Sequence, residues 1–150
     1  MSLSFAELRD LPSPFYRAAV KALIFDDQQR LLVIVNADGM AELPGGGWEH
    51  NETLEECVRR EMLEEIGVEP KTISPVVQVA RGHSVHGWRT LRLLVRVEPA
   101  STQFVLGDGM QAVRYVTKDE MLGLTFNPAD AGIQNITNSI WSESQDTYEQ

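Results

Sequence analysis

The sequence has a single cysteine among its 150 residues and contains no long apolar run. Because Cys57 is alone, an internal disulfide and a cysteine-based zinc site are both excluded. No apolar stretch approaches the roughly 18 residues that a membrane helix needs. Acidic residues near the N-terminus, in MSLSFAELRDLPSPF, argue against a secretory signal. We therefore expect a cytoplasmic protein without a membrane partner.

Basic residues are also scarce, with 13 lysines and arginines against 22 acidic residues and a net charge of −9. This deficit argues against binding along the phosphate backbone of a long nucleic acid. It is compatible with a small phosphorylated ligand, because a divalent cation held by carboxylates reverses the local field. We expect a small phosphorylated partner.

Repeats, low-complexity tracts and internal linkers are absent as well, and the length fits one hydrophobic core. We expect a single domain over residues 1–150, in which residues 1–15 form a loose lead-in that ends at Pro12-Ser13-Pro14. Apolar and alternating patterns predict strands over residues 17–25, 30–36, 40–43, 73–80, 90–97 and 111–116. Helices are expected over 54–66 and 118–122, and a last helix from Asn127-Pro128 would carry Ile133, Ile136, Ile140 and Trp141. This mixture predicts a layered α/β fold.

The stretch from Leu43 to Val68 is unusually acidic, with eight glutamates when Glu69, one residue beyond it, is counted. It opens with the turn-like sequence Pro44-Gly45-Gly46-Gly47. Thr53 and Glu56 then have the spacing of a capping box, and Gly67 fits the end of a helix. The stretch therefore predicts a glycine loop followed by a capped acidic helix.

Glu61, Glu64 and Glu65 are spaced i, i+3 and i+4, which places three carboxylates within a roughly 100° arc of the helix. Their mutual repulsion would turn into binding if a hard divalent cation were present, and Mg²⁺ prefers oxygen ligands. Arg60 lies beside them and can pair with Glu52. The alternative is a solvated acidic helix face, and the position after a glycine loop favours the metal site.

The spacing Gly46-x5-Glu52-x7-Arg60-Glu61-Met62-x-Glu64-Glu65-x-Gly67-Val68 resembles the Nudix box, G-x5-E-x7-R-E-U-x-E-E-x-G-U. Every defined position is filled, and Met62 is a mild variant at the bulky aliphatic position. The MutT-like Nudix hydrolases implied by this resemblance have an α/β/α sandwich with a mixed sheet. They cleave a nucleoside diphosphate linked to another moiety by attack of water on phosphorus.

The resemblance also implies roles for individual residues. Glu61, Glu64, Glu65 and the backbone carbonyl of Gly45 would ligate Mg²⁺, or Mn²⁺ in its place, and Glu52 and Arg60 would support the loop and helix. Many relatives carry one more glutamate before the late strand, where this sequence offers Asp108 and Gln111. The general base is therefore either Glu61, which we favour, or Asp108, and the number of metal ions stays open.

Substrate choice lies outside the box. Arg81 could hold phosphate oxygens, Trp88 could stack on a base, and Asp108 and Gln111 lie in a second candidate region. Ser84, Val85 and His86 stand where ADP-ribose and diadenosine-polyphosphate subfamilies carry a proline or tyrosine, which leaves a nucleoside triphosphate or similar small nucleotide by default. A catalytically inactive nucleotide-sensing module is the alternative, and an isoprenoid-diphosphate isomerase is disfavoured because Cys57 lies inside the helix. Homodimerisation stays open.

Overall fold

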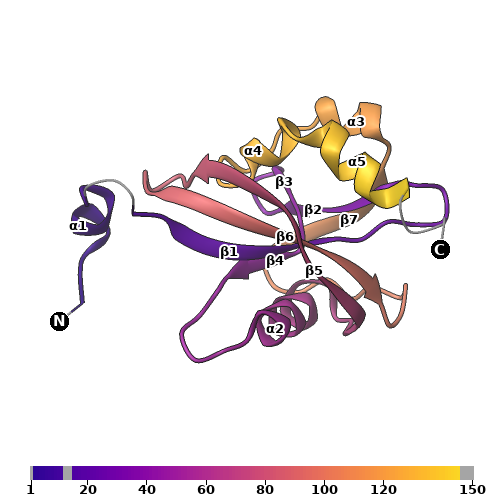
Figure 1. The fold of residues 1–150 in the computed structure, drawn as a ribbon, viewed down its shortest axis with the longest axis horizontal. Coiled ribbons are helices and arrows are strands. Elements are labelled where there is room, and N and C mark those ends of the chain that lie inside the picture. Colours follow the sequence, from indigo (N-terminus) through magenta and orange to yellow (C-terminus); the bar gives the residue numbers. More distant parts are fainter. Residues whose placement is uncertain (1, 12–14, 146–150) are drawn as a thin grey trace.

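The computed structural model of the protein describes residues 2–11 and 15–145 (Figure 1). Pro12–Pro14, the predicted end of the lead-in, lie outside the described residues. The lead-in contains a short helix that the sequence analysis did not predict, α1 (Phe5–Arg9), which begins with a capping box between Ser4 and Glu7. Figure 1 shows α1 beyond the start of the first strand and apart from the other helices.

The strands of the described chain form two sheets, which confirms the predicted α/β fold with a mixed sheet. The first sheet has the order β4-β1-β6-β5, with β1 parallel to β6 and antiparallel to β4. The second has the order β3-β2-β7 and is antiparallel. The strands are β1 (Arg17–Leu23), β2 (Leu31–Asn36), β3 (Ala41–Glu42), β4 (Gly45–Gly47), β5 (Pro70–His83), β6 (Arg89–Pro99) and β7 (Met110–Val116).

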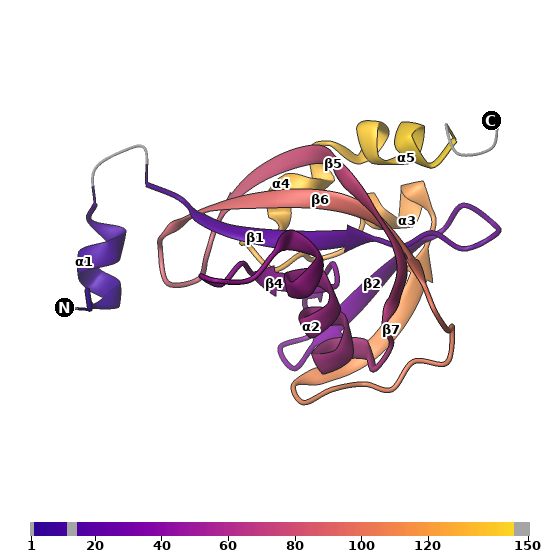
Figure 2. The ribbon, with the colours of Figure 1, turned by 60° about the horizontal axis from the view of Figure 1, so that its bottom comes forward.

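Helices cover the first sheet on both faces (Figures 1 and 2). They are α2 (Leu54–Ile66), α4 (Ala131–Gln134) and α5 (Thr137–Gln145), and α3 (Lys118–Leu122) lies against α5 and β7. Alternate residues of β1 serve the two faces: Val20 and Ala22 pack with α2, and Leu23 packs with α4 and α5. Within the described residues, no helix combines the length and apolar character needed to cross a membrane.

The acidic helix α2 forms as predicted. Thr53 caps its start and shares a reciprocal capping box with Glu56, and Gly67 ends it in the left-handed conformation with a φ of 69°. Val58 and Met62 of the predicted apolar row are buried against β1 and β2, and Leu54 is partly buried beside them. The helix is therefore fixed by its own sequence at both ends and by the core along one side.

Two predictions about the glycine loop and the last helix need correction. The glycines Gly45–Gly47 form strand β4 on the edge of the first sheet, where Gly46 pairs with Val20, and not only a turn. The last helix does not begin at Asn127-Pro128. Asp130 is the N-cap of α4, and a break at residues 135–136 separates α4 from α5.

Two glycines bring α4 unusually close to the first sheet. A Cβ at Gly132 would overlap the backbone carbonyl of Arg81, and one at Gly82 would lie 2.7 Å from the carbonyl of Ala129. This close packing places Asp130, which is 1% exposed, over β1 and β6. The C-terminal part of the chain thereby supplies a buried acid to the same sheet whose edge is β4.

Candidate active site

The acidic helix α2 and the glycine strand β4 meet through one side chain and one backbone group. Glu65 is 7% exposed, and its Oε1 accepts a hydrogen bond of 2.7 Å from the backbone N–H of Gly45. Gly46 lies under the Glu61 carboxylate, so that a Cβ at position 46 would overlap it. Two of the three predicted metal ligands on α2 therefore lie directly against β4.

Arg60 binds several acidic residues of the site at once. Its Nε and Nη2 donate to the two carboxylate oxygens of Glu52 at 3.1 and 2.8 Å, and Nη1 donates to Glu61 at 2.7 Å. Nη2 also donates to the carbonyl of Gly47 at 3.1 Å. The pKa of Glu52 is held at about 2, chiefly by its hydrogen bonds with Arg60. The predicted pairing of Arg60 with Glu52 is thus present and extends to β4.

Burial sets the electrostatics of Glu65. Loss of solvent raises the pKa of its carboxyl to about 8, although the positive charge of Lys21 and the Gly45 N–H both act to lower that pKa. The carboxyl therefore keeps its proton to a higher pH than an ordinary glutamate does, because burial outweighs the nearby Lys21 charge. A divalent ion at this position would restore its negative charge.

Glu64, the third predicted ligand on the helix, has a side chain that is 60% exposed. Its backbone carbonyl is contacted by Gly107, where a Cβ would overlap it, and the N–H of Gly107 donates to the carbonyl of Glu65 at 3.0 Å. The loop before β7 therefore lies against the end of α2. Asp108 is exposed in that loop next to Gly107, whereas the Gln111 side chain donates to the carbonyl of Ala37 at 2.8 Å.

The donor chemistry of this corner fits a hard cation, since carboxylate and carbonyl oxygens are the ligands that Mg²⁺ prefers. Glu61 and Glu65 both lie against the backbone of β4, which places two such carboxylates at this corner. Across residues 2–11 and 15–145, however, no three histidine, cysteine or acidic side chains converge closely enough to hold an ion. Glu61 is instead paired with Arg60, and Glu65 with the backbone of Gly45. The ligand set stays a prediction.

A buried ion cluster beside β4 was missed by the sequence analysis. Lys21 of β1 is 5% exposed, and its Nζ donates to the carbonyls of Leu43 and Gly45 at 3.1 and 2.9 Å. Asp130 lies 3.4 Å from this ammonium group, and its other oxygen accepts from Arg92 Nε at 2.8 Å. Burial would lower the pKa of Lys21, but the charges of Asp130, Glu65 and Glu42 outweigh burial and raise it. One signal was available in the sequence, a lysine in the middle of an apolar strand.

The predicted substrate residues Arg81 and Trp88 lie near the turn between β5 and β6. Arg81 is exposed and lines a pocket of about 230 Å³ with Tyr16, His83 and Arg89. Trp88 is only 7% exposed, and the Arg17 guanidinium lies 5.0 Å from the centroid of its ring. Trp88 is therefore a packed side chain with a cation over one face.

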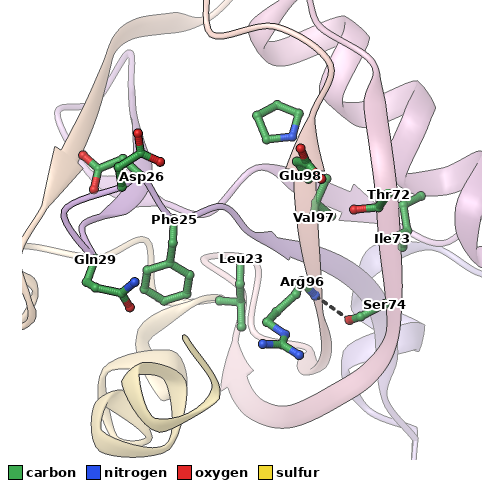
Figure 3. Close-up of a pocket in the computed structure, with 12 residues that line it drawn as sticks. Leu23, Phe25, Asp26, Gln29, Thr72, Ile73, Ser74, Arg96, Val97 and Glu98 are labelled. Carbon is green, nitrogen blue, oxygen red and sulfur yellow. Dashed lines mark hydrogen bonds between the residues drawn. The ribbon is translucent and has the colours of Figure 1, made fainter. Parts of the chain in front are cut away.

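A larger cavity of about 440 Å³ lies at the other end of β1 (Figure 3). Figure 3 shows the Phe25 ring and the Gln29 side chain on one side of it and Thr72, Ile73 and Ser74 of β5 on the other. Its lining includes no residue of α2 or β4. The larger cavity therefore lies away from the predicted metal ligands. We place the candidate active site at the contact between α2 and β4.

Comparison with known proteins identifies the family and the fold of the chain. The family model of the NUDIX domain matches residues 15–135. The crystal structure of the MutT protein from Methanosarcina mazei Go1 is similar with a TM-score of 0.74 and 18% identity, covering 90% of this chain and 99% of that one. No curated protein matches the sequence.

Two further solved structures of similar fold are of proteins named for an activity. An ADP-ribose pyrophosphatase from Streptococcus suis has a TM-score of 0.64 and 18% identity, covering 91% of this chain and 97% of that one. The E. coli dihydroneopterin triphosphate pyrophosphohydrolase has a TM-score of 0.65 and 16% identity, covering 88% of this chain and 99% of that one. At such identities the likeness is one of fold.

Proposed function

Because the chain belongs to the Nudix hydrolase family, we propose that it is a Mg²⁺-dependent pyrophosphohydrolase that cleaves a nucleoside diphosphate linked to another moiety. Mn²⁺ would substitute for Mg²⁺. The observation that carries the proposal is the contact between Glu65 and the Gly45 N–H, with Glu61 over Gly46 beside it. This contact brings two carboxylates, those of Glu61 and Glu65, to the backbone of β4 at one edge of the sheet.

In this proposal Glu61, Glu64, Glu65 and the Gly45 carbonyl hold the metal. A bound divalent cation would neutralise the diphosphate and make a coordinated water more acidic. Arg60 holds Glu52 and Glu61 and bonds to the Gly47 carbonyl, so that the helix and the strand keep their spacing. The protein then contributes mainly positioning and charge, which is what phosphoryl chemistry requires.

A carboxylate must also accept the proton of the attacking water. Glu61 is our candidate because its side chain is 14% exposed and lies at β4 beside Arg60. Asp108 is the second candidate, since its loop lies against the backbone of Glu64 and Glu65. Glu61→Gln and Asp108→Asn would separate the two, because only loss of the base should remove the acidic limb of the rate profile, in which kcat rises with pH as the base loses its proton.

The substrate we propose is a small nucleotide, for example a nucleoside triphosphate, and the protein would act on it in the cytoplasm. The acidic surface, with a net charge of −9, supports a small ligand over a long nucleic acid. The two fold neighbours named as an ADP-ribose pyrophosphatase and a dihydroneopterin triphosphate pyrophosphohydrolase support small phosphorylated compounds as the substrate class. Of the predicted substrate contacts, the exposed Arg81 and Asp108 remain our candidates, whereas Trp88 is packed and the Gln111 amide donates to the Ala37 carbonyl.

The proposal is tested with a panel of nucleoside triphosphates, nucleotide sugars and ADP-ribose, each with Mg²⁺ or Mn²⁺ and scored for release of phosphate and diphosphate. Turnover that requires the metal and is lost in Glu65→Gln supports it. An absence of turnover on every compound, together with tight binding of one of them, would favour a nucleotide-sensing module instead.

A further inference from the structure

We propose that Lys21 is a positioning residue of this site, which fixes the Gly45 carbonyl in the orientation in which its oxygen can ligate a divalent cation. The inference rests on the proposed function and adds a residue outside the box. Lys21 lies on β1, which pairs directly with β4, and the two backbones align Lys21 with Gly45. Its ammonium group therefore reaches the carbonyl from the neighbouring strand.

The backbone polar groups of Leu43–Gly45 are all paired with fixed partners. The N–H of Leu43 donates to Asp130 at 3.3 Å and its carbonyl accepts from Lys21. The Pro44 carbonyl accepts from the Ala22 N–H at 2.7 Å. The Gly45 N–H donates to Glu65, and its carbonyl accepts from Lys21. Lys21 supplies two of these five bonds, so the orientation of the segment depends on it.

Gly45 cannot hold its carbonyl by local preference alone. Its φ of 131° is open to glycine and strained for other residues, and a Cβ there would overlap the carbonyl of Val20. A carbonyl oxygen has two lone pairs, and Lys21 uses one of them. The second lone pair is left for a metal ion, in an orientation that the ammonium group defines.

Lys21 is itself held in place from the C-terminal part of the chain. Asp130 lies 3.4 Å from its Nζ and is in turn bonded to Arg92, so the ammonium group has a fixed counter-charge. A buried lysine costs more free energy than an apolar side chain of the same length. Space filling alone therefore does not explain a lysine here, whereas control of the two carbonyls does.

The test is the affinity of the metal-free protein for Mn²⁺, measured by electron paramagnetic resonance in Lys21→Met and in the wild type. We expect the substitution to weaken Mn²⁺ binding about tenfold, as for other residues that hold a metal ligand in place. The Mg²⁺ concentration for half-maximal turnover should rise by the same factor. The direction of the change in Mn²⁺ affinity is informative, because loss of a positive charge alone would strengthen cation binding.

Ile140→Ala is the matched control, since it removes buried side-chain volume from α5 without contacting β4. It should lower the melting temperature and leave Mn²⁺ affinity within threefold. An unchanged or stronger affinity in folded Lys21→Met overturns the inference while leaving the hydrolase proposal intact. A wild type that binds no Mn²⁺ overturns both. If Lys21→Met does not fold, Asp130→Asn replaces it, and an affinity within twofold of the wild type overturns the inference.

Discussion

The carboxylate of Glu65 accepts a 2.7 Å hydrogen bond from the backbone N–H of Gly45, 20 residues earlier in the chain. Through this bond a helix residue and a strand backbone share one polar site in the interior. The carbonyl of the same glycine accepts a bond from Lys21. The backbone of Gly45 therefore lies between an acidic side chain, Glu65, and a basic one, Lys21. Several measurable properties follow from this arrangement.

Loss of a carboxylate should abolish most turnover without unfolding the protein. We expect Glu64→Gln and Glu65→Gln each to lower kcat about 100-fold or more, because a metal ligand supplies several kcal/mol of transition-state stabilisation. The measurement is steady-state hydrolysis at saturating Mg²⁺, with circular dichroism to confirm the fold. Exposed Glu55 on the same helix offers the control variant Glu55→Gln. Near-wild-type rates in both site variants would contradict the ligand assignment.

Glu65 should make the metal-free protein less stable as the pH rises. The pKa of its carboxyl is raised from an ordinary 4.5 to about 8 by burial, so the folded state holds its proton longer than the unfolded state does. The free energy of unfolding then falls as the pH rises from 4.5 to about 8, by about 1.4 kcal/mol for each pH unit. Glu65→Gln should remove the loss, and its stabilising effect in urea titrations should be larger at pH 8 than at pH 5. An effect independent of pH would contradict this.

Arg60 should control the titration of Glu52. Hydrogen bonds with Arg60 hold the pKa of the Glu52 carboxyl at about 2, and Arg60→Met should return that pKa toward the usual range of a glutamate. The measurement is the ¹³C chemical shift of the Glu52 carboxyl between pH 2 and 6. Arg60→Lys retains the charge without the bidentate hydrogen bonding and should give an intermediate pKa for Glu52. A midpoint that does not move in Arg60→Met would show that Arg60 is not the cause.

Two neighbouring glycines should respond differently to alanine. Gly45→Ala places a Cβ against the Val20 carbonyl at a φ of 131°, so it should destabilise the fold by roughly 2 kcal/mol or more. Gly46→Ala meets the flexible Glu61 carboxylate, which can turn away. That variant should keep most of its stability and lose most of its turnover. Thermal unfolding and kcat are measured for both, and equal losses of stability would contradict the distinction.

Cys57 should be inert to thiol reagents in the folded protein. Burial raises the pKa of its thiol to about 12, and its Sγ lies 3.7 Å from the Gly47 carbonyl. Little thiolate is then present at pH 8, so 5,5′-dithiobis(2-nitrobenzoate) should react only as the protein unfolds in urea. Rapid labelling of the native protein would contradict this prediction and indicate a reactive thiol at Cys57.

The sequence predicted the local parts of the site well. Thr53, Glu56 and Gly67 define α2 through bonds made within a few residues, so its bounds and capping could be predicted from spacing alone. Glu52 and Arg60 are likewise separated by two helical turns and a short loop. Contacts of this range depend on the local sequence and on the geometry of one helix.

The parts that could not be predicted depend on distant partners. Strand β4 consists of three glycines, which carry no alternation of apolar and polar side chains, and it is defined only by pairing with β1. Helix α4 packs through Gly132 against the backbone of Arg81, which is distant from it in the sequence. Lys21 and Asp130 are 109 residues apart, and nothing near either residue in the sequence identifies the other.

The pairing of Lys21 with Asp130 means that the proposed metal-binding segment, although contiguous in sequence, depends on residues outside it. A peptide covering Gly45–Val68 would contain every predicted metal ligand, yet the residues that orient the first of them would be missing. Transplanting the segment into another protein would need two further residues, one from each end of the chain. In this proposal the C-terminal part of the chain positions Asp130 for the site as well as covering the sheet.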